Sequence, residues 1–164
     1  MKRMIAPVLF FVFAISLNAQ SSIDRLFERY QGLDGFVTVT ISGNFLKMVG
    51  KFDDGDDDFL RNADKFTAIR ILAQEDDNME VDNFYDIVMD EIDKGGYEEM
   101  VRVNSSDSDV KIMVKAEGNV FTEFLLVTGG SENAIIQIKG KLTEEMIREM
   151  SESIDDDNVM FGMR

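Results

Sequence analysis

Apolar residues recur every three or four positions in four segments of the chain, which is the spacing of helices that bury one side. The predicted helices begin near Ser22, Ser42, Val81 and Thr143. Ser and Thr are typical N-caps, because their hydroxyl groups accept hydrogen bonds from backbone N–H groups of the first turn. A shorter helical segment is predicted over residues 57–64. In the second helix the apolar residues are Phe45, Leu46 and Val49.

Alternation of apolar and polar residues predicts six strands. The first two are FVTVTI (36–41) and KFTAIRILAQ (65–74), each followed by a predicted helix. The other four are YEEMVRV, DVKIMVKA, VFTEFLLVT and NAIIQIKGKL, and only short linkers rich in Gly, Asn, Asp and Ser separate them. Such linkers are typical of antiparallel hairpins. The order of elements predicts one α+β domain, with a mixed sheet that ends in a four-strand antiparallel meander and helices packed on one face.

The N-terminus resembles a secretory signal peptide. Lys2 and Arg3 precede an apolar run over residues 4–17, and Ala19 offers a small residue at a cleavage point. The run is shorter than the ~20 residues that a membrane-spanning helix needs. We therefore expect a signal peptide over 1–19, a single domain over 20–154 and a tail over 155–164. The protein should be exported, to the periplasm or outside the cell.

The composition excludes several functional classes. The formal net charge is −15, and such a chain is repelled by nucleic acid phosphates, so a charged partner should be cationic. The chain contains no His and no Cys. Ser-His-Asp triads, Cys-His dyads, ordinary zinc sites and a lipid-modified cysteine are therefore excluded. We expect a protein without enzymatic activity, cofactor or lipid anchor that binds a protein partner.

The stretch KFDDGDDDFL (51–60) is the candidate metal site. Asp54, Asp56 and Asp58 occupy positions one, three and five of a calcium-binding EF-hand loop. Position six should then be glycine and position twelve glutamate, but these are Phe59 and Lys65. The EF-hand pattern is therefore absent. A solvated lead-in to a helix explains the aspartates, and weak calcium binding by the three named residues is the alternative.

The strand DVKIMVKA supplies the candidate partner-binding residues. Its valine and isoleucine residues point to one side, whereas Lys111, Met113 and Lys115 point to the other. We interpret the second side as a face in contact with water. Lys111, Met113 and Lys115 are therefore our candidates for contact with a protein partner.

The succession of segments is also similar to a known family. A helix such as SSIDRLFERYQG is followed by FVTVTISGNFLKMV, then AIRILAQED, NFYDIVMDEI, GGYEEMVRV, DVKIMVKAEG and the pair FLLVTGG and AIIQIKGKL. This order resembles a domain-of-unknown-function family of small exported proteins of Gram-negative bacteria. The resemblance implies no catalytic residues and no cofactor, and it implies a link to envelope-stress signalling. Some members carry a lipoprotein cysteine, which this chain lacks.

Overall fold

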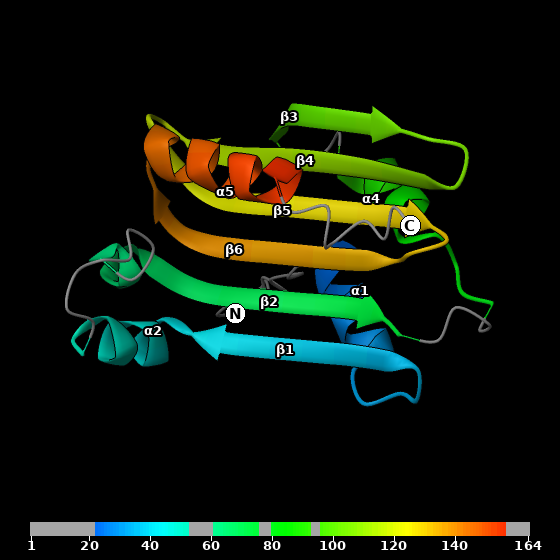
Figure 1. The fold of residues 1–164 in the computed structure, drawn as a ribbon, viewed down its shortest axis with the longest axis horizontal. Helices are drawn as coiled ribbons and strands as arrows, with labels where there is room; N and C mark the ends of the chain where they lie inside the picture. The colour runs from blue at the N-terminus through cyan, green and yellow to red at the C-terminus, as the bar shows by residue number, and fades with distance from the viewer. Residues whose placement is uncertain (1–21, 53–60, 76–79, 93–95, 157–164) are drawn as a thin grey trace, which may run out of the picture.

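The computed structural model describes residues 22–52, 61–75, 80–92 and 96–156. Six strands form one sheet in the order β1-β2-β6-β5-β4-β3, so β1 and β3 are its two edges (Figure 1). Every neighbouring pair is antiparallel. The strands are β1 (Phe36–Ser42), β2 (Phe66–Gln74), β3 (Tyr97–Asn104), β4 (Ser108–Glu117), β5 (Val120–Gly130) and β6 (Ala134–Leu142).

Helices lie on both faces of this sheet (Figure 1). The helices in the described part of the chain are α1 (Ser22–Tyr30), α2 (Gly43–Gly50), α4 (Phe84–Ile92), α5 (Glu144–Asp156) and the 3-10 helix η1 (Ala63–Lys65). The helices α1 and α4 pack on one face, here the α4 face; α5 packs on the other, the α5 face, with α2 and η1 at its end. None of the described helices is long and apolar enough to cross a membrane.

The α+β class and the C-terminal four-strand meander are confirmed. Two details differ from the prediction, because the sheet is antiparallel throughout and its helices cover two faces. The reason lies in the central strands, which are apolar on both sides. In β5, Leu125 and Val127 join the hydrophobic cluster of the α4 face, whereas Phe124 and Leu126 join that of the α5 face. Fully burying such a side chain contributes about 1.5–3 kcal/mol, so both faces need a covering layer.

Two predicted N-caps position helices at the same end of the sheet. The Ser42 hydroxyl accepts a hydrogen bond from the Phe45 backbone N–H (3.3 Å), and Thr143 does the same for Met146 (3.3 Å). A Cβ at the buried Gly43 would lie 2.9 Å from the Thr67 carbonyl oxygen, so the start of α2 packs directly against β2. Of the apolar residues predicted on α2, Leu46 is buried and Phe45 is exposed.

Candidate binding surfaces

The three side chains predicted to form a wet face of β4 lie on the α4 face. Met113 is only 1% exposed and packs in the cluster with α1 and α4. The Lys111 ammonium lies 2.9 Å from a Glu99 carboxylate oxygen and 5.7 Å from the centre of the Tyr85 ring. Lys115 is half-buried, with its ammonium 5.7 Å from the centre of the Tyr97 ring. The prediction that this face of β4 contacts water is therefore wrong, because α1 and α4 pack over it, and partner contact by these residues stays a prediction.

The other predicted site residues, Asp54, Asp56 and Asp58, lie outside the described residues. Within the described ranges, no three acidic side chains come together in a way that could hold a metal ion. Weak calcium binding by the acidic stretch therefore also stays a prediction.

A chain of hydrogen-bonded polar side chains crosses the α4 face, and none of the site residues predicted from the sequence belongs to it. The Arg70 guanidinium donates to Asp24 on α1 (2.6 Å) and to the Gln137 side-chain carbonyl (2.7 Å). The Gln137 amide donates to Glu123 Oε1, and the Tyr97 hydroxyl donates to the same oxygen from β3 (2.6 Å). The network therefore links one helix to four strands. Its sequence signal is a glutamate and a glutamine inside otherwise apolar central strands, since buried polar groups require partners.

Two pKa shifts define the hydrogen-bonding roles at this side of the sheet. Burial, together with the nearby Glu123 carboxylate, raises the pKa of Tyr97 far above its ordinary value, so the phenol keeps its proton and acts as a donor. Hydrogen bonds from Arg102 and Lys111 lower the pKa of Glu99, which stays ionised as an acceptor. Tyr97 therefore links β3 to Glu123 on β5, and Glu99 links β3 to Lys111 on β4.

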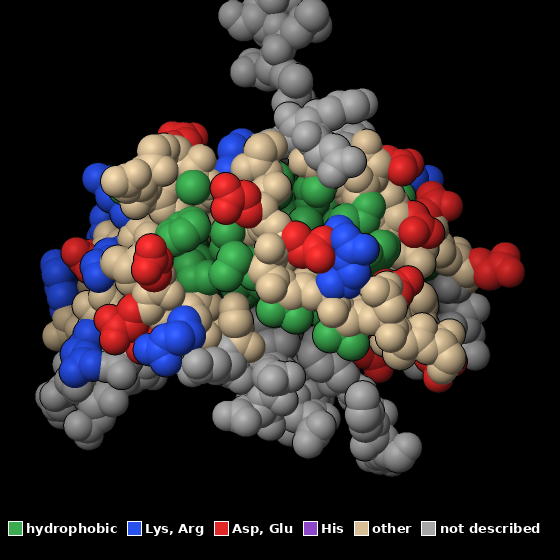
Figure 2. Space-filling model, turned by 90° about the horizontal axis from the view of Figure 1, so that it is seen from above, with side chains coloured by type: hydrophobic (Ala, Val, Ile, Leu, Met, Phe, Trp, Pro, Cys, Tyr) green, Lys and Arg blue, Asp and Glu red, His purple; other side chains and the backbone are tan. Residues whose placement is uncertain are grey.

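The β3 edge is exposed along nearly its whole length. Every residue of β3 after Tyr97 is exposed, including Met100 (51%), Val101 (37%) and Val103 (51%). The pairing of β3 with β4 skips a residue between Glu99 and Val101, which places a bulge at Met100. A view onto this edge shows hydrophobic side chains interspersed with acidic and basic ones (Figure 2). The β3 edge thus offers apolar contact area, and it also has the charges and the bulge that commonly protect edge strands from pairing with other strands.

The β1 edge is different. β1 pairs with β2 in one continuous register from Phe36 to Ser42, without a bulge. Its sequence, FVTVTIS, contains no charged residue. Val39 is 37% exposed and Thr40 is exposed as well. Natural edge strands are commonly protected by charges, proline or bulges, and β1 has none of these devices.

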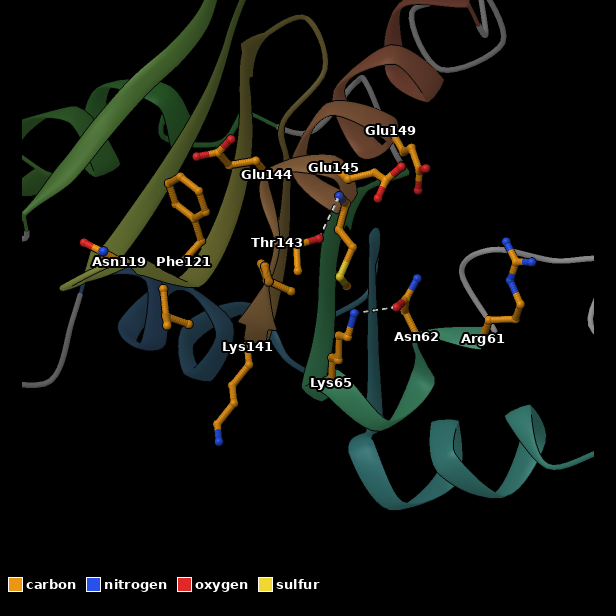
Figure 3. Close-up of a pocket in the computed structure, with 13 residues that line it drawn as sticks. Arg61, Asn62, Lys65, Asn119, Phe121, Lys141, Thr143, Glu144, Glu145 and Glu149 are labelled. Carbon is orange, nitrogen blue, oxygen red and sulfur yellow. Dashed lines mark hydrogen bonds between the residues drawn. The ribbon is translucent and has the colours of Figure 1, made fainter.

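An open cavity of about 750 Å³ lies at the end of the sheet where α5 begins (Figure 3). Glu144, Glu145 and Glu149 lie along α5 on one side, and η1 with the residues before it lies across from them. The Lys65 ammonium there donates to the Asn62 side-chain carbonyl (2.7 Å). The remaining lining residues are Arg61, Asn119, Val120, Phe121, Lys141, Leu142, Thr143 and Met146. The volume suits a small molecule, but charges of both signs line the cavity, so it does not select a class of ligand.

A family model described as a domain of unknown function, DUF4252, matches residues 30–150, from the end of α1 into α5. The chain belongs to the DUF4252 family. No curated protein and no solved structure matches it. The DUF4252 match includes both sheet edges, all of the polar network except Asp24, and the cavity. The expected resemblance to a family of unknown function is thereby confirmed.

Proposed function

We propose that this DUF4252 protein is an exported, non-enzymatic module that binds a cationic protein partner along the β3 edge. The observation that carries the proposal is that Met100, Val101 and Val103 are exposed together on β3, an edge strand of the open sheet. The bulge at Met100 opposes the addition of a further strand, so the partner would contact the exposed side chains of β3 and would not extend the sheet. The apolar side chains supply the contact area.

Charge supports a cationic partner. The whole chain has a formal net charge of −15. Glu98 and Asp107 are exposed at or near the β3 edge, and Glu99 is held in place by Arg102 (2.6 Å) and Lys111 (2.9 Å). Such a field attracts a basic protein and accelerates the encounter, so binding should weaken as salt is added.

In this proposal Lys111, Met113 and Lys115, which were predicted to contact the partner, support the β3 edge from β4 instead of touching the partner themselves. Lys111 reaches Glu99 from β4, and Met113 packs in the core of the α4 face on the strand next to β3. We propose that Lys111 positions Glu99 for the partner, and that Met113 and Lys115 hold the strand pair together.

Site-specific photocrosslinking tests the β3 proposal. A photoreactive amino acid at Val103 should give adducts with a basic protein in the envelope fraction, whereas one at the exposed Glu28 on α1 should not. The purified partner should then bind the chain, and Val101→Ser with Val103→Ser should weaken its affinity roughly tenfold or more, because both changes remove apolar area at the contact and leave the charge unchanged. Equal adduct yields from both positions would remove the β3 edge from consideration.

Export is part of the proposal and rests on the apolar N-terminal segment. The resemblance to exported proteins adds the link to envelope-stress signalling. N-terminal sequencing of the protein from the envelope or medium should begin at Gln20. Recovery of the uncut chain from the cytosol alone would contradict export.

Weak calcium binding by Asp54, Asp56 and Asp58 is a separate proposal, supported only by the spacing of these aspartates. Calorimetric titration with millimolar calcium tests it. Binding should produce heat and raise the melting temperature, and Asp56→Asn should reduce both effects. If calcium leaves the melting temperature unchanged, the acidic stretch is only a solvated connection.

A further inference from the structure

The β1 edge, whose strand has no charged residue and no bulge, leads to an inference that is independent of the β3 proposal. We propose that two copies of this chain pair through their β1 strands, antiparallel, about a two-fold axis that passes through Val39. The sheet would then continue from one copy into the other. Closed two-fold dimers are the commonest assemblies of soluble proteins, and they require a surface that is complementary to itself.

The sequence of β1 is complementary to itself in one register. With Val39 opposite Val39 of the second copy, Val37 faces Ile41 and Thr38 faces Thr40. Val39 and Ile41 pair with Ile71 and Ile69 of β2, so this row lies on the α5 face and is apolar throughout. Facing side chains on paired strands stabilise a sheet through their mutual contact, and these apolar residues would contact each other across the axis.

The row of threonine residues gives a second, independent indication that β1 pairs with the β1 strand of another copy. Thr38 pairs with Leu72, a residue of the α4-face core, so the threonines lie on that face. Among the described residues, the Thr38 hydroxyl is the one buried side-chain polar atom without a hydrogen-bond partner. A buried hydroxyl group without a hydrogen-bond partner lowers the stability of the folded chain. In the proposed register the exposed Thr40 side chain of the second copy stands opposite Thr38, and rotation of the Thr38 side chain out of its buried position would bring the two hydroxyl groups within reach of a hydrogen bond.

Charge favours β1 over β3 as the self-pairing edge. Pairing two β3 strands would bring the charges of Glu98, Glu99 and Arg102 of both copies to one interface, and the bulge at Met100 would interrupt the added ladder. No charge meets across two β1 strands. The repulsion that remains is the long-range one between two chains of charge −15, and salt screens it beyond about 10 Å at 0.1 M. Dimerisation should therefore strengthen with salt, whereas binding of a cationic partner at β3 should weaken.

Sedimentation analysis of the purified chain tests the dimer. The wild type should show a dimer whose dissociation constant falls as sodium chloride is raised. Val39→Lys and Val39→Glu should each raise that constant by about tenfold or more, because like charges then face each other at the axis. The two variants mixed in equal amounts should form a heterodimer, because lysine then faces glutamate, and this recovery also shows that both variants are folded.

Matched controls on the other edge are Val103→Lys and Val103→Glu, which should leave the dimer intact. A wild type that stays monomeric at every salt concentration would overturn the inference. So would a dimer that Val39→Lys leaves intact, or a variant mixture that stays monomeric. None of these outcomes bears on β3, because partner binding there is measured separately by crosslinking at Val103.

Discussion

Removing the Tyr97 hydroxyl should destabilise the protein through a single hydrogen bond. The substitution Tyr97→Phe keeps the ring, which packs against the core of the α4 face, and deletes only the group that donates to Glu123 (2.6 Å). Glu123 as a residue is only 8% exposed, so water cannot readily replace the lost donor. The Gln137 amide still donates to the same oxygen, and the charge therefore keeps one partner.

The size of the effect follows from the charge on the acceptor. Hydrogen bonds to charged groups contribute about 1.5–3 kcal/mol to stability, more than those between neutral groups. We therefore expect Tyr97→Phe to lower the free energy of unfolding by about 2 kcal/mol. With a urea dependence of roughly 2 kcal/mol per molar, the midpoint of urea unfolding should fall by about 1 M.

A double-mutant cycle isolates this hydrogen bond. Urea unfolding followed by circular dichroism would compare the wild type, Tyr97→Phe, Glu123→Gln and the double variant. The coupling free energy between the two positions should reach about 1 kcal/mol or more, because the residues share one bond. Tyr85→Phe is the matched control, since the Tyr85 hydroxyl makes no hydrogen bond to another described residue.

A coupling below about 0.5 kcal/mol would refute the reasoning, because distant sites already show deviations of that size. An equal loss of stability in Tyr85→Phe would also refute it. In that case the removal of a phenol hydroxyl, and not the contact with Glu123, would account for the effect.

Three further predictions follow from local contacts. The contribution of Tyr97 to the free energy of unfolding should be complete below the ordinary Tyr pKa of 10.0 and should fall above it, because the unfolded chain then loses a phenolic proton that the folded chain keeps. Urea unfolding at increasing alkaline pH should therefore show a shallower fall in stability for Tyr97→Phe than for the wild type. Gly129→Ala should lower the free energy of unfolding by about 1–3 kcal/mol, because the added Cβ would meet Asn83 and lie 2.6 Å from the Tyr85 Cβ. Gly118→Asn is the control and should change the free energy of unfolding little, because the turn at Gly118 has open space and asparagine tolerates its positive φ. Ser42→Ala should cost about 1 kcal/mol in urea unfolding through loss of the α2 N-cap, and Ser42→Thr should retain most of it.

The meander was predictable because its information is local. Each hairpin is specified by two alternating strands and a short turn, as at Gly118 and Gly130, whose positive φ values suit glycine. The N-caps Ser42 and Thr143 are equally local and were also predictable.

The position of the covering layers was not predictable from alternation. A period of two says that the faces of β4 differ, but it does not say which face is wet. Met113 is buried because α4 and α1 pack over it, and Lys111 is buried because Glu99 neutralises its charge. Long lysine stems and methionine both suit such a place, so their presence does not identify an exposed surface.

The candidate surfaces were even less accessible to prediction, because they depend on strand order. Nothing in the sequence FVTVTIS shows that β1 pairs with β2 along one edge and lies at the border of the sheet along the other. The polar network likewise joins Asp24 and Gln137, which are far apart in the sequence. Only the isolated Glu123 and Gln137 in apolar strands pointed toward it.

The pairing of β2 with β6 also has a consequence for the speed of folding. The strands β3 to β6 meet through short hairpins, so this part of the sheet can assemble quickly. Ile71, in contrast, pairs with Ile136 across a long stretch of chain. Closing this long loop lowers the conformational entropy of the chain before the contact between the strands can stabilise it. Until the β1–β2 pair arrives, β6 is itself an open edge of apolar residues such as Ile135 and Ile138. The interval before the two halves meet is therefore the period in which this chain is most exposed to misassembly.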